Sequence, residues 1–188
     1  MLKNLARRTL DTVRRFRKSP DGATAVEFAL VAGPFFFVLG CVCETGLMLF
    51  TEYVIQNAVQ EASRTVRTGQ ASTSAGTIVI DAATFKSNLC ADISTLIDCA
   101  GKVTVYVNNA TDFATLKTNI ADPLNIGQKA DGTWTATVYQ PGGAKAAAGV
   151  IATYDWKFVF PFMNLLGNVM SNTKRRLYGI AIFRNEPF

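Results

Sequence analysis

Few residues in this chain could do chemistry: it has four cysteines, scattered carboxylates and no histidine. Without histidine, Ser-His-Asp and Cys-His catalysis and every imidazole metal site are excluded. A zinc site built on thiolates needs four clustered cysteines, but Cys41 and Cys43 lie in an apolar run whereas Cys90 and Cys99 follow far downstream. The sequence also has no glycine-rich phosphate loop and no outstanding carboxylate pair. It therefore predicts neither an enzyme nor a metal or cofactor site.

The apolar run that holds the first cysteine pair reads FALVAGPFFFVLGCVC, from Phe28 to Cys43. Its sixteen uncharged residues fall short of the roughly 20 that span a bilayer. The run becomes long enough if it extends from Ala23 to Phe50, which requires the bilayer to accommodate Glu27 and Glu44. The alternative is the buried core helix of a soluble protein. Three successive phenylalanines beside a basic leader favour the membrane.

The net charge of +5 comes from residues 1–22, which hold seven Lys/Arg against two Asp, while the rest of the chain is neutral. Positive charge directly before an apolar run favours membrane topology over nucleic-acid binding. The positive-inside rule then keeps residues 1–22 cytoplasmic and exports the C-terminal part. No small-x-small cleavage site follows the run, so an ordinary secretory signal is not expected. The 188 residues suffice for a membrane segment and one small domain.

The helix that begins in the apolar run is expected to continue past it, over residues 23–68 as a whole. Pro34 lies inside this span and should kink the helix, and Gly69 is a suitable residue to end it. The outer half carries a stripe of small apolar residues at steps of four, which predicts an amphipathic helix; the stripe consists of Val54, Ala58, Ala62 and Val66.

Residues 69–188 read as an exported α+β domain. Its four β-branched and aromatic stretches with a period of two predict an antiparallel meander; they are residues 102–107, 133–139, 150–160 and 177–184. Residues 87–101 read as a short helix that ends near Asp98, and Lys174–Arg176 as a solvated turn. The expected fold class is α+β, with the long N-terminal helix packed on a small antiparallel sheet. In an oxidising compartment Cys90 and Cys99, nine residues apart, should form a local disulfide, whereas Cys41 and Cys43 are too misaligned in a helix to bond each other.

A short segment at the start of the apolar helix resembles a known processing site. Gly22-Ala23-Thr24-Ala25-Val26-Glu27-Phe28 follows a basic leader, with Gly and Glu spaced as in type IV prepilins. The longer stretch, residues 21–50, resembles the TadE-like minor pseudopilins of tight-adherence (Tad, or Flp-type) pili. In that family a G-x-x-x-x-E-F/Y core is followed by a proline and a second glutamate, the places that Pro34 and Glu44 occupy here. The Cys90/Cys99 pair and residues 154–156 and 183–187 are similar to the exported part of such proteins.

The resemblance implies a pilin-like fold and a set of roles. A prepilin peptidase would cut between Gly22 and Ala23 and release residues 1–22 as a cleaved leader, leaving Glu27 near a new N-terminal amine. Glu27 and Phe28 would then serve assembly, and Glu44 would mark the outer interface or contact another subunit. The implied partners are the peptidase, other pilin or pseudopilin subunits, the inner-membrane pilus assembly platform and the membrane itself, with no nucleic acid.

These expectations place the protein in a bacterial inner membrane as a single-pass protein, with its N-terminus cytoplasmic and its C-terminal domain periplasmic, or incorporated in a surface pilus that serves adhesion. An alternative class remains open: an uncleaved, membrane-anchored extracytoplasmic binding domain. The two differ in the mature N-terminus, which is Ala23 in the first case and the intact leader in the second.

Overall fold

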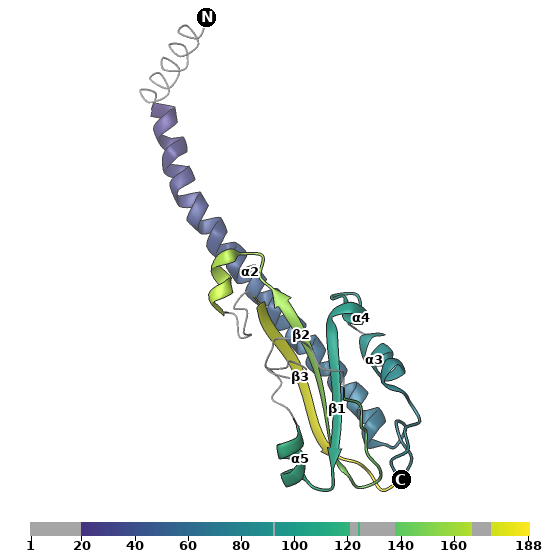
Figure 1. The fold of residues 1–188 in the computed structure, drawn as a ribbon. Helices are drawn as coiled ribbons and strands as arrows, with labels where there is room; N and C mark the ends of the chain where they lie inside the picture. The colour runs from purple at the N-terminus through teal and green to yellow at the C-terminus, as the bar shows by residue number, and fades with distance from the viewer. Residues whose placement is uncertain (1–19, 92, 121–123, 125–137, 167–173) are drawn as a thin grey trace, which may run out of the picture. The chain divides into compact units, whose positions relative to one another are not determined.

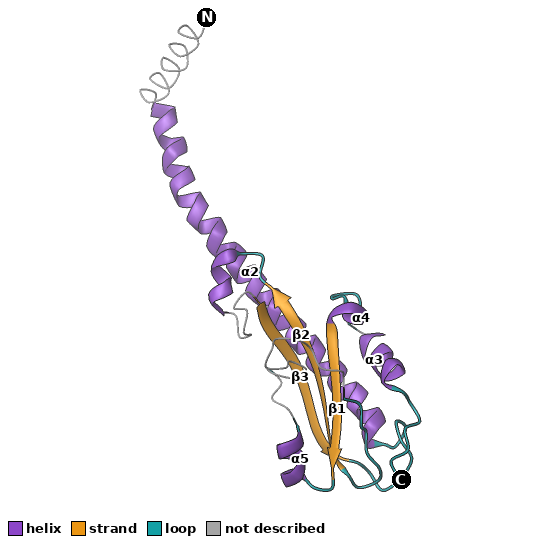
Figure 2. Ribbon diagram, in the orientation of Figure 1, coloured by secondary structure: helices purple, strands orange, loops and turns teal. Residues whose placement is uncertain are grey.

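The computed structural model describes residues 20–91, 93–120, 124, 138–166 and 174–188. Along the chain these form α2 (Pro20–Arg67), α3 (Ala82–Ala91), α4 (Cys99–Lys102), β1 (Val103–Ala110), α5 (Phe113–Asn119), β2 (Ala147–Lys157), the 3₁₀ helix η1 (Pro161–Leu166) and β3 (Lys174–Arg184) (Figures 1 and 2). The chain divides into two compact units, Met1–Cys43 and Glu44–Phe188, and α2 contributes residues to both.

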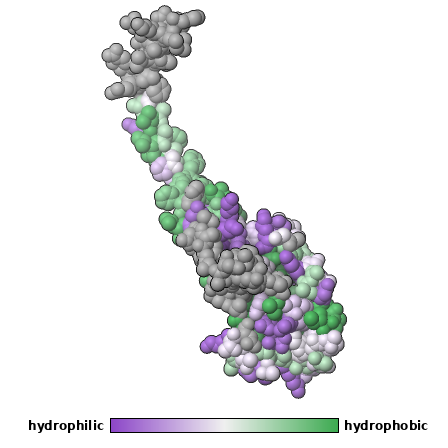
Figure 3. All heavy atoms as spheres, viewed as in Figure 1, coloured by the Kyte–Doolittle hydropathy of each residue, from purple (hydrophilic) through white to green (hydrophobic). Residues whose placement is uncertain are grey.

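The described part of the first unit is the N-terminal half of α2. Its apolar side chains are exposed; Phe28, Leu30 and Val31 each expose 71% of their surface, and Figure 3 shows such side chains along this part of the helix. Among the described residues, α2 is the one helix long and apolar enough to cross a membrane. The helix continues past Pro34 to Arg67, so the predicted long helix is confirmed, while the kink at Pro34 stays a prediction.

At its C-terminal end α2 closes in a Schellman motif. The Gln70 N–H donates to the Thr65 carbonyl at 3.0 Å and the Gly69 N–H to the Val66 carbonyl at 3.2 Å. This geometry needs a residue in the left-handed region, and Gly69 has φ +77°. The Phe188 ring also lies where a Cβ on Gly69 would be. Gly69 therefore ends the helix as the sequence predicts. A larger residue there would strain the backbone and would also clash with Phe188.

The second unit is built on a three-stranded antiparallel sheet in the order β1-β2-β3. This confirms an antiparallel sheet but corrects the predicted meander, in which residues 133–139 would separate the first and third stretches. Residues 125–137 lie outside the described part of the chain. Residues 138–140 join the opposite edge of β1, where Tyr139 forms a parallel bridge with Val107. The Val107 N–H donates to the Val138 carbonyl at 2.8 Å, and the Gln140 N–H to the Val107 carbonyl at 2.9 Å.

The C-terminal half of α2 packs against β3. Ala58 and Val66 of the predicted stripe are buried, whereas Val54 and Ala62 are half-buried. The buried face also includes Ile55 and Val59, which are fully buried, so the prediction is confirmed in part. The closest approach is at Gly179, where an added Cβ would lie 2.9 Å from Cα of Gln56. A side chain at this position would push the helix off the sheet.

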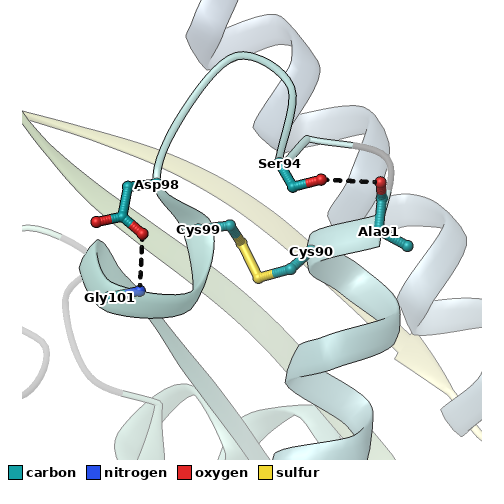
Figure 4. Close-up of a disulfide and its surroundings, with 6 residues drawn as sticks. All are labelled: Cys90, Ala91, Ser94, Asp98, Cys99 and Gly101. Atoms are coloured by element: carbon teal, nitrogen blue, oxygen red, sulfur yellow. Dashed lines mark hydrogen bonds between the residues drawn. A yellow bond between two sulfur atoms is a disulfide. The ribbon is translucent and has the colours of Figure 1, made fainter.

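The disulfide Cys90–Cys99 forms as predicted, with the two Cα atoms 5.5 Å apart (Figure 4). The predicted helix through Asp98 is wrong beyond Ala91, where α3 ends. Asp98 instead starts a new helix, because its carboxylate accepts a hydrogen bond from the Gly101 N–H at 3.2 Å as the N-cap of α4. The disulfide thus joins the last turn of one short helix to the first residue of the next.

Candidate functional site

The residues of the expected processing site lie near the start of the described part of α2. The sequence suggests that Asp21 and Gly22 disfavour helix, but Gly22 is helical and buried. Glycine in a helix interior costs only about 1 kcal/mol relative to alanine, too little to end a helix that the following apolar residues support. A peptidase that needs an extended backbone must therefore unwind this turn, and glycine resists unwinding less than any residue except proline.

Ala23, Glu27 and Phe28 are all exposed on the same helix. Ala23 and Glu27 are four residues apart, so they lie one turn apart on one helix face. If Ala23 became the N-terminus, its amine would lie about one helical turn from the carboxylate of Glu27. The backbone thus permits the ion pair that the resemblance implies for these two residues.

Glu44 is bound within its own chain, while its expected place at the outer interface or in a contact to another subunit stays a prediction. It exposes 5% of its surface. Its Oε1 accepts from the Val159 N–H at 2.6 Å and its Oε2 from the Phe160 N–H at 3.2 Å. The carboxylate is therefore bound by the chain's own backbone, 115 residues downstream, immediately before η1. Its first role is to hold the segment between β2 and η1 against α2.

A second polar contact between α2 and the sheet was not anticipated from the sequence. The Gln56 side chain donates to the Ile180 carbonyl at 2.9 Å and accepts from the Ile180 N–H at 2.8 Å. The amide thereby satisfies both backbone groups of one residue on the edge strand β3, as a neighbouring strand would do. In the sequence, Gln56 is one of several polar residues on an amphipathic helix, so nothing there indicates that it binds the backbone of a strand.

Arg176 corrects the prediction of a solvated turn at 174–176. It lies in β3 and exposes 2% of its surface. Its Nε donates to Asp155 Oδ1 at 2.7 Å, its Nη2 to Asp155 Oδ2 at 3.1 Å, and its Nη1 to the Leu124 carbonyl at 2.8 Å. Asp155 and Arg176 are directly opposite in the register of β2 and β3. This two-pronged pair fixes the strand register, because a shift by one residue would bury an unpaired charge.

The closing residues 183–187 connect separate parts of the domain through hydrogen bonds. The Asn185 side chain donates to the carbonyls of Pro141 and Gly143 at 3.1 and 2.9 Å. The Glu186 N–H donates to the Arg67 carbonyl at 2.9 Å, and the Arg67 guanidinium pairs with the Glu186 carboxylate at 3.2 Å. The segment therefore ties the end of α2 to the loop before β2.

Among the described residues, Tyr139 is the one whose pKa is shifted furthest from its ordinary value. Its ring lies 5.4 Å from that of Phe85, centroid to centroid. Burial, with a smaller contribution from the charge of Asp81, raises the pKa of Tyr139 to about 12. The direction of the shift is the one that burial produces, which is consistent with a packing role for Tyr139.

Neither a metal centre nor a reactive cysteine pair emerges from the described residues. They contain no group of three or more His, Cys, Asp or Glu side chains that could hold a metal ion. Cys41 and Cys43 are not joined in a disulfide. The described residues form packing contacts, and the carboxylates of Glu44 and Asp155 are bound within the fold, which suits a structural subunit.

A long apolar N-terminal helix packed on a three-stranded antiparallel sheet is a pilin-like arrangement. The comparison with known families agrees with this class. Residues 22–64, which comprise most of α2, match the family model described as TadE-like protein. No curated protein and no solved structure matches the chain. The family match implies a role in Tad pilus biogenesis and an envelope location, and proteins of this family are generally non-catalytic.

Proposed function

We propose that the protein is a minor pseudopilin that a prepilin peptidase cleaves after Gly22 and that then acts in assembly of a Tad-type surface pilus. The observation that carries this proposal is the family match over residues 22–64, which begins at the glycine of the G-x-x-x-x-E-F core. The match ends within the half of α2 that packs on the sheet. Both the recognised segment and the folded domain thus share one helix.

The chemistry of the proposed cleavage suits the residues. Glycine has no Cβ, so a protease can approach its carbonyl closely and draw the backbone into an extended form. Cleavage gives Ala23 a free amine, which is positively charged near neutral pH. Glu27 is then the nearest carboxylate along the helix, and pairing lowers the cost of both charges at the edge of the lipid. Paired in one chain or between neighbours, these charges would set helix register during assembly.

The proposed location follows from the same helix. The exposed apolar side chains of α2 between residues 26 and 42 need lipid or other apolar helices around them. The basic residues before them keep that end cytoplasmic, so the sheet domain with its Cys90–Cys99 disulfide lies in the periplasm. The proposed partners are the peptidase, other pilin or pseudopilin subunits and the inner-membrane assembly platform.

The proposal is tested by blocking cleavage at one position. Gly22→Leu should abolish the size shift of the protein on immunoblots and abolish its support of piliation in a strain that lacks the native copy. Gly33→Leu is the matched control, because it adds the same side chain to the same helix at a position with open space around it. Processing of the Gly22→Leu chain at the same place would contradict the proposal, and the uncleaved anchored domain would then describe the protein better if the unaltered chain also kept its leader.

A further inference from the structure

Positive charge gathers at one end of the sheet. Lys157, the last residue of β2, and Lys174, the first of β3, are direct cross-strand partners. Like charges placed opposite each other destabilise a sheet. Among the described residues neither lysine forms an ion pair, since Asp155 is bound by Arg176 and the third lysine of this end, Lys102, pairs with Asp98 at 3.9 Å. Such a pair of lysines would be stabilised by an anion supplied from outside the chain.

The three lysines border one surface hollow of about 370 Å³. The other side chains that line it are two amphipathic aromatic residues, Tyr154 and Trp156, the apolar Val159, and Asp155, whose charge is paired with Arg176. Lysines mixed with tyrosine and tryptophan are typical of the boundary between lipid headgroups and acyl chains. The hollow therefore has the composition of an interfacial belt.

Directly after this hollow, η1 exposes large apolar side chains. Val159, Phe162 and Leu165 leave 78%, 72% and 85% of their surface uncovered. Residues three apart in a 3₁₀ helix are eclipsed, so Phe162 and Leu165 share one side of η1, while Met163 is buried against the domain. The helix thus turns an apolar edge outward, next to the lysines.

The place of η1 along α2 is fixed by Glu44, which binds the backbone N–H groups of Val159 and Phe160. Exposed apolar side chains continue on α2 beyond Glu44, at Leu47, Leu49 and Phe50. Phe50 is six residues, or about 9 Å, further along the helix axis than Glu44. The start of η1 is therefore held beside a part of α2 whose outward side chains still suit lipid.

We propose that η1 and the lysines at this end of the sheet form a docking surface for the anionic phospholipid face of the membrane that α2 enters. The lysine ammonium groups bind headgroup phosphates, and Val159, Phe162 and Leu165 enter the acyl boundary. Glu44 makes this possible, because its charge is satisfied by two backbone donors rather than exposed to lipid. The inference rests on the proposed membrane insertion of α2 and adds a second, reversible contact that fixes the sheet domain on the outer leaflet.

Spin-label accessibility tests the contact on the full chain. Cys41 and Cys43 are changed to Ser, the disulfide is kept, and Leu165→Cys receives a maleimide nitroxide in nanodiscs of mixed phosphatidylcholine and phosphatidylglycerol. The label should collide more often with oxygen, which concentrates in lipid, than with a water-soluble nickel chelate. Val79→Cys, an exposed apolar site in a loop of the same domain, is the matched control and should show the reverse preference.

A label at Val38→Cys, inside the apolar half of α2, separates the docking surface at η1 from the membrane insertion of α2 on which it rests. Lipid exposure at 38 with water exposure at 165 overturns the docking surface and leaves membrane insertion intact. Water exposure at 38 as well overturns membrane insertion itself. A label at 165 shielded from both reagents shows a protein contact, such as a second copy of this chain, and also overturns the lipid assignment.

The charge contribution is tested by comparing lipids. Omitting phosphatidylglycerol should reduce the oxygen preference at 165, and Lys157→Gln/Lys174→Gln should remove this lipid dependence. Lys117→Gln/Lys145→Gln removes the same charge near the opposite end of the sheet, where Ala147 pairs with Ala110, and should retain the dependence. Equal responses of the two variants would overturn the role given to the lysines.

Discussion

Glu44 offers the sharpest test of how the sheet domain is fastened to α2. In Glu44→Gln one carboxylate oxygen becomes an NH₂ group. This group is a donor, so it cannot accept the hydrogen bond that the facing backbone N–H donates to the carboxylate. One charge-assisted hydrogen bond is lost, and a hydrogen bond to a charged group contributes roughly 1.5–3 kcal/mol. The remaining oxygen can still serve either Val159, now at 2.6 Å, or Phe160, at 3.2 Å. The variant should therefore open the segment before η1 without unfolding the domain.

Amide hydrogen exchange measures that opening directly. A loss of about 2 kcal/mol raises the local opening constant roughly thirtyfold, so a peptide covering residues 157–163 should exchange about thirtyfold faster. Glu61→Gln is the control, because it removes the same charge from an exposed position on the same helix. Glu44→Ala leaves both N–H groups without the carboxylate and should exchange faster still. Exchange in Glu44→Gln at the rate of the unaltered protein would refute the fastening role.

Three further predictions concern the other charged and reactive side chains. Glu27→Gln should be cleaved and membrane-inserted but fail to support pili in electron micrographs, because an unpaired charge beside lipid costs roughly 3–5 kcal/mol; normal piliation would remove the pairing mechanism. Non-reducing peptide mapping should find Cys90 linked to Cys99 and thiol labels on Cys41 and Cys43 alone. Labels on Cys90 and Cys99 before reduction would contradict export. Because the folded protein raises the pKa of Tyr139 to about 12 from 10.0, it holds that proton more tightly than the unfolded chain does. Stability should therefore fall as pH rises through this window, and Tyr139→Phe should flatten the fall in unfolding experiments; an identical fall in both proteins would contradict it.

The features that the sequence predicted correctly rest on local patterns. The apolar run and the basic leader specify the long helix, Gly69 specifies its end through one backbone conformation, and the short separation of Cys90 and Cys99 permits their disulfide. The individual strands follow from stretches in which β-branched and aromatic residues alternate with others. Each of these depends on neighbours within a few residues, which a single sequence displays.

What the sequence did not predict depends on partners far along the chain. The burial of Arg176 requires the register that places Asp155 opposite it, and a run of three basic residues at 174–176 otherwise indicates a solvated turn. Glu44 finds its donors 115 residues away. The bridge of Tyr139 to the outer edge of β1 depends on which edge α2 leaves open. Periodicity carries none of this information, because it fixes which face is apolar and not which element covers it.

The central claim is that the chain is a processed pseudopilin, and the N-terminus of the mature protein tests it most directly. Intact-mass measurement of the protein extracted from membranes of piliated cells should give a chain that begins at Ala23, and cells without the prepilin peptidase should give the chain with its leader. A full-length chain that begins before Gly22 in piliated cells would contradict the claim.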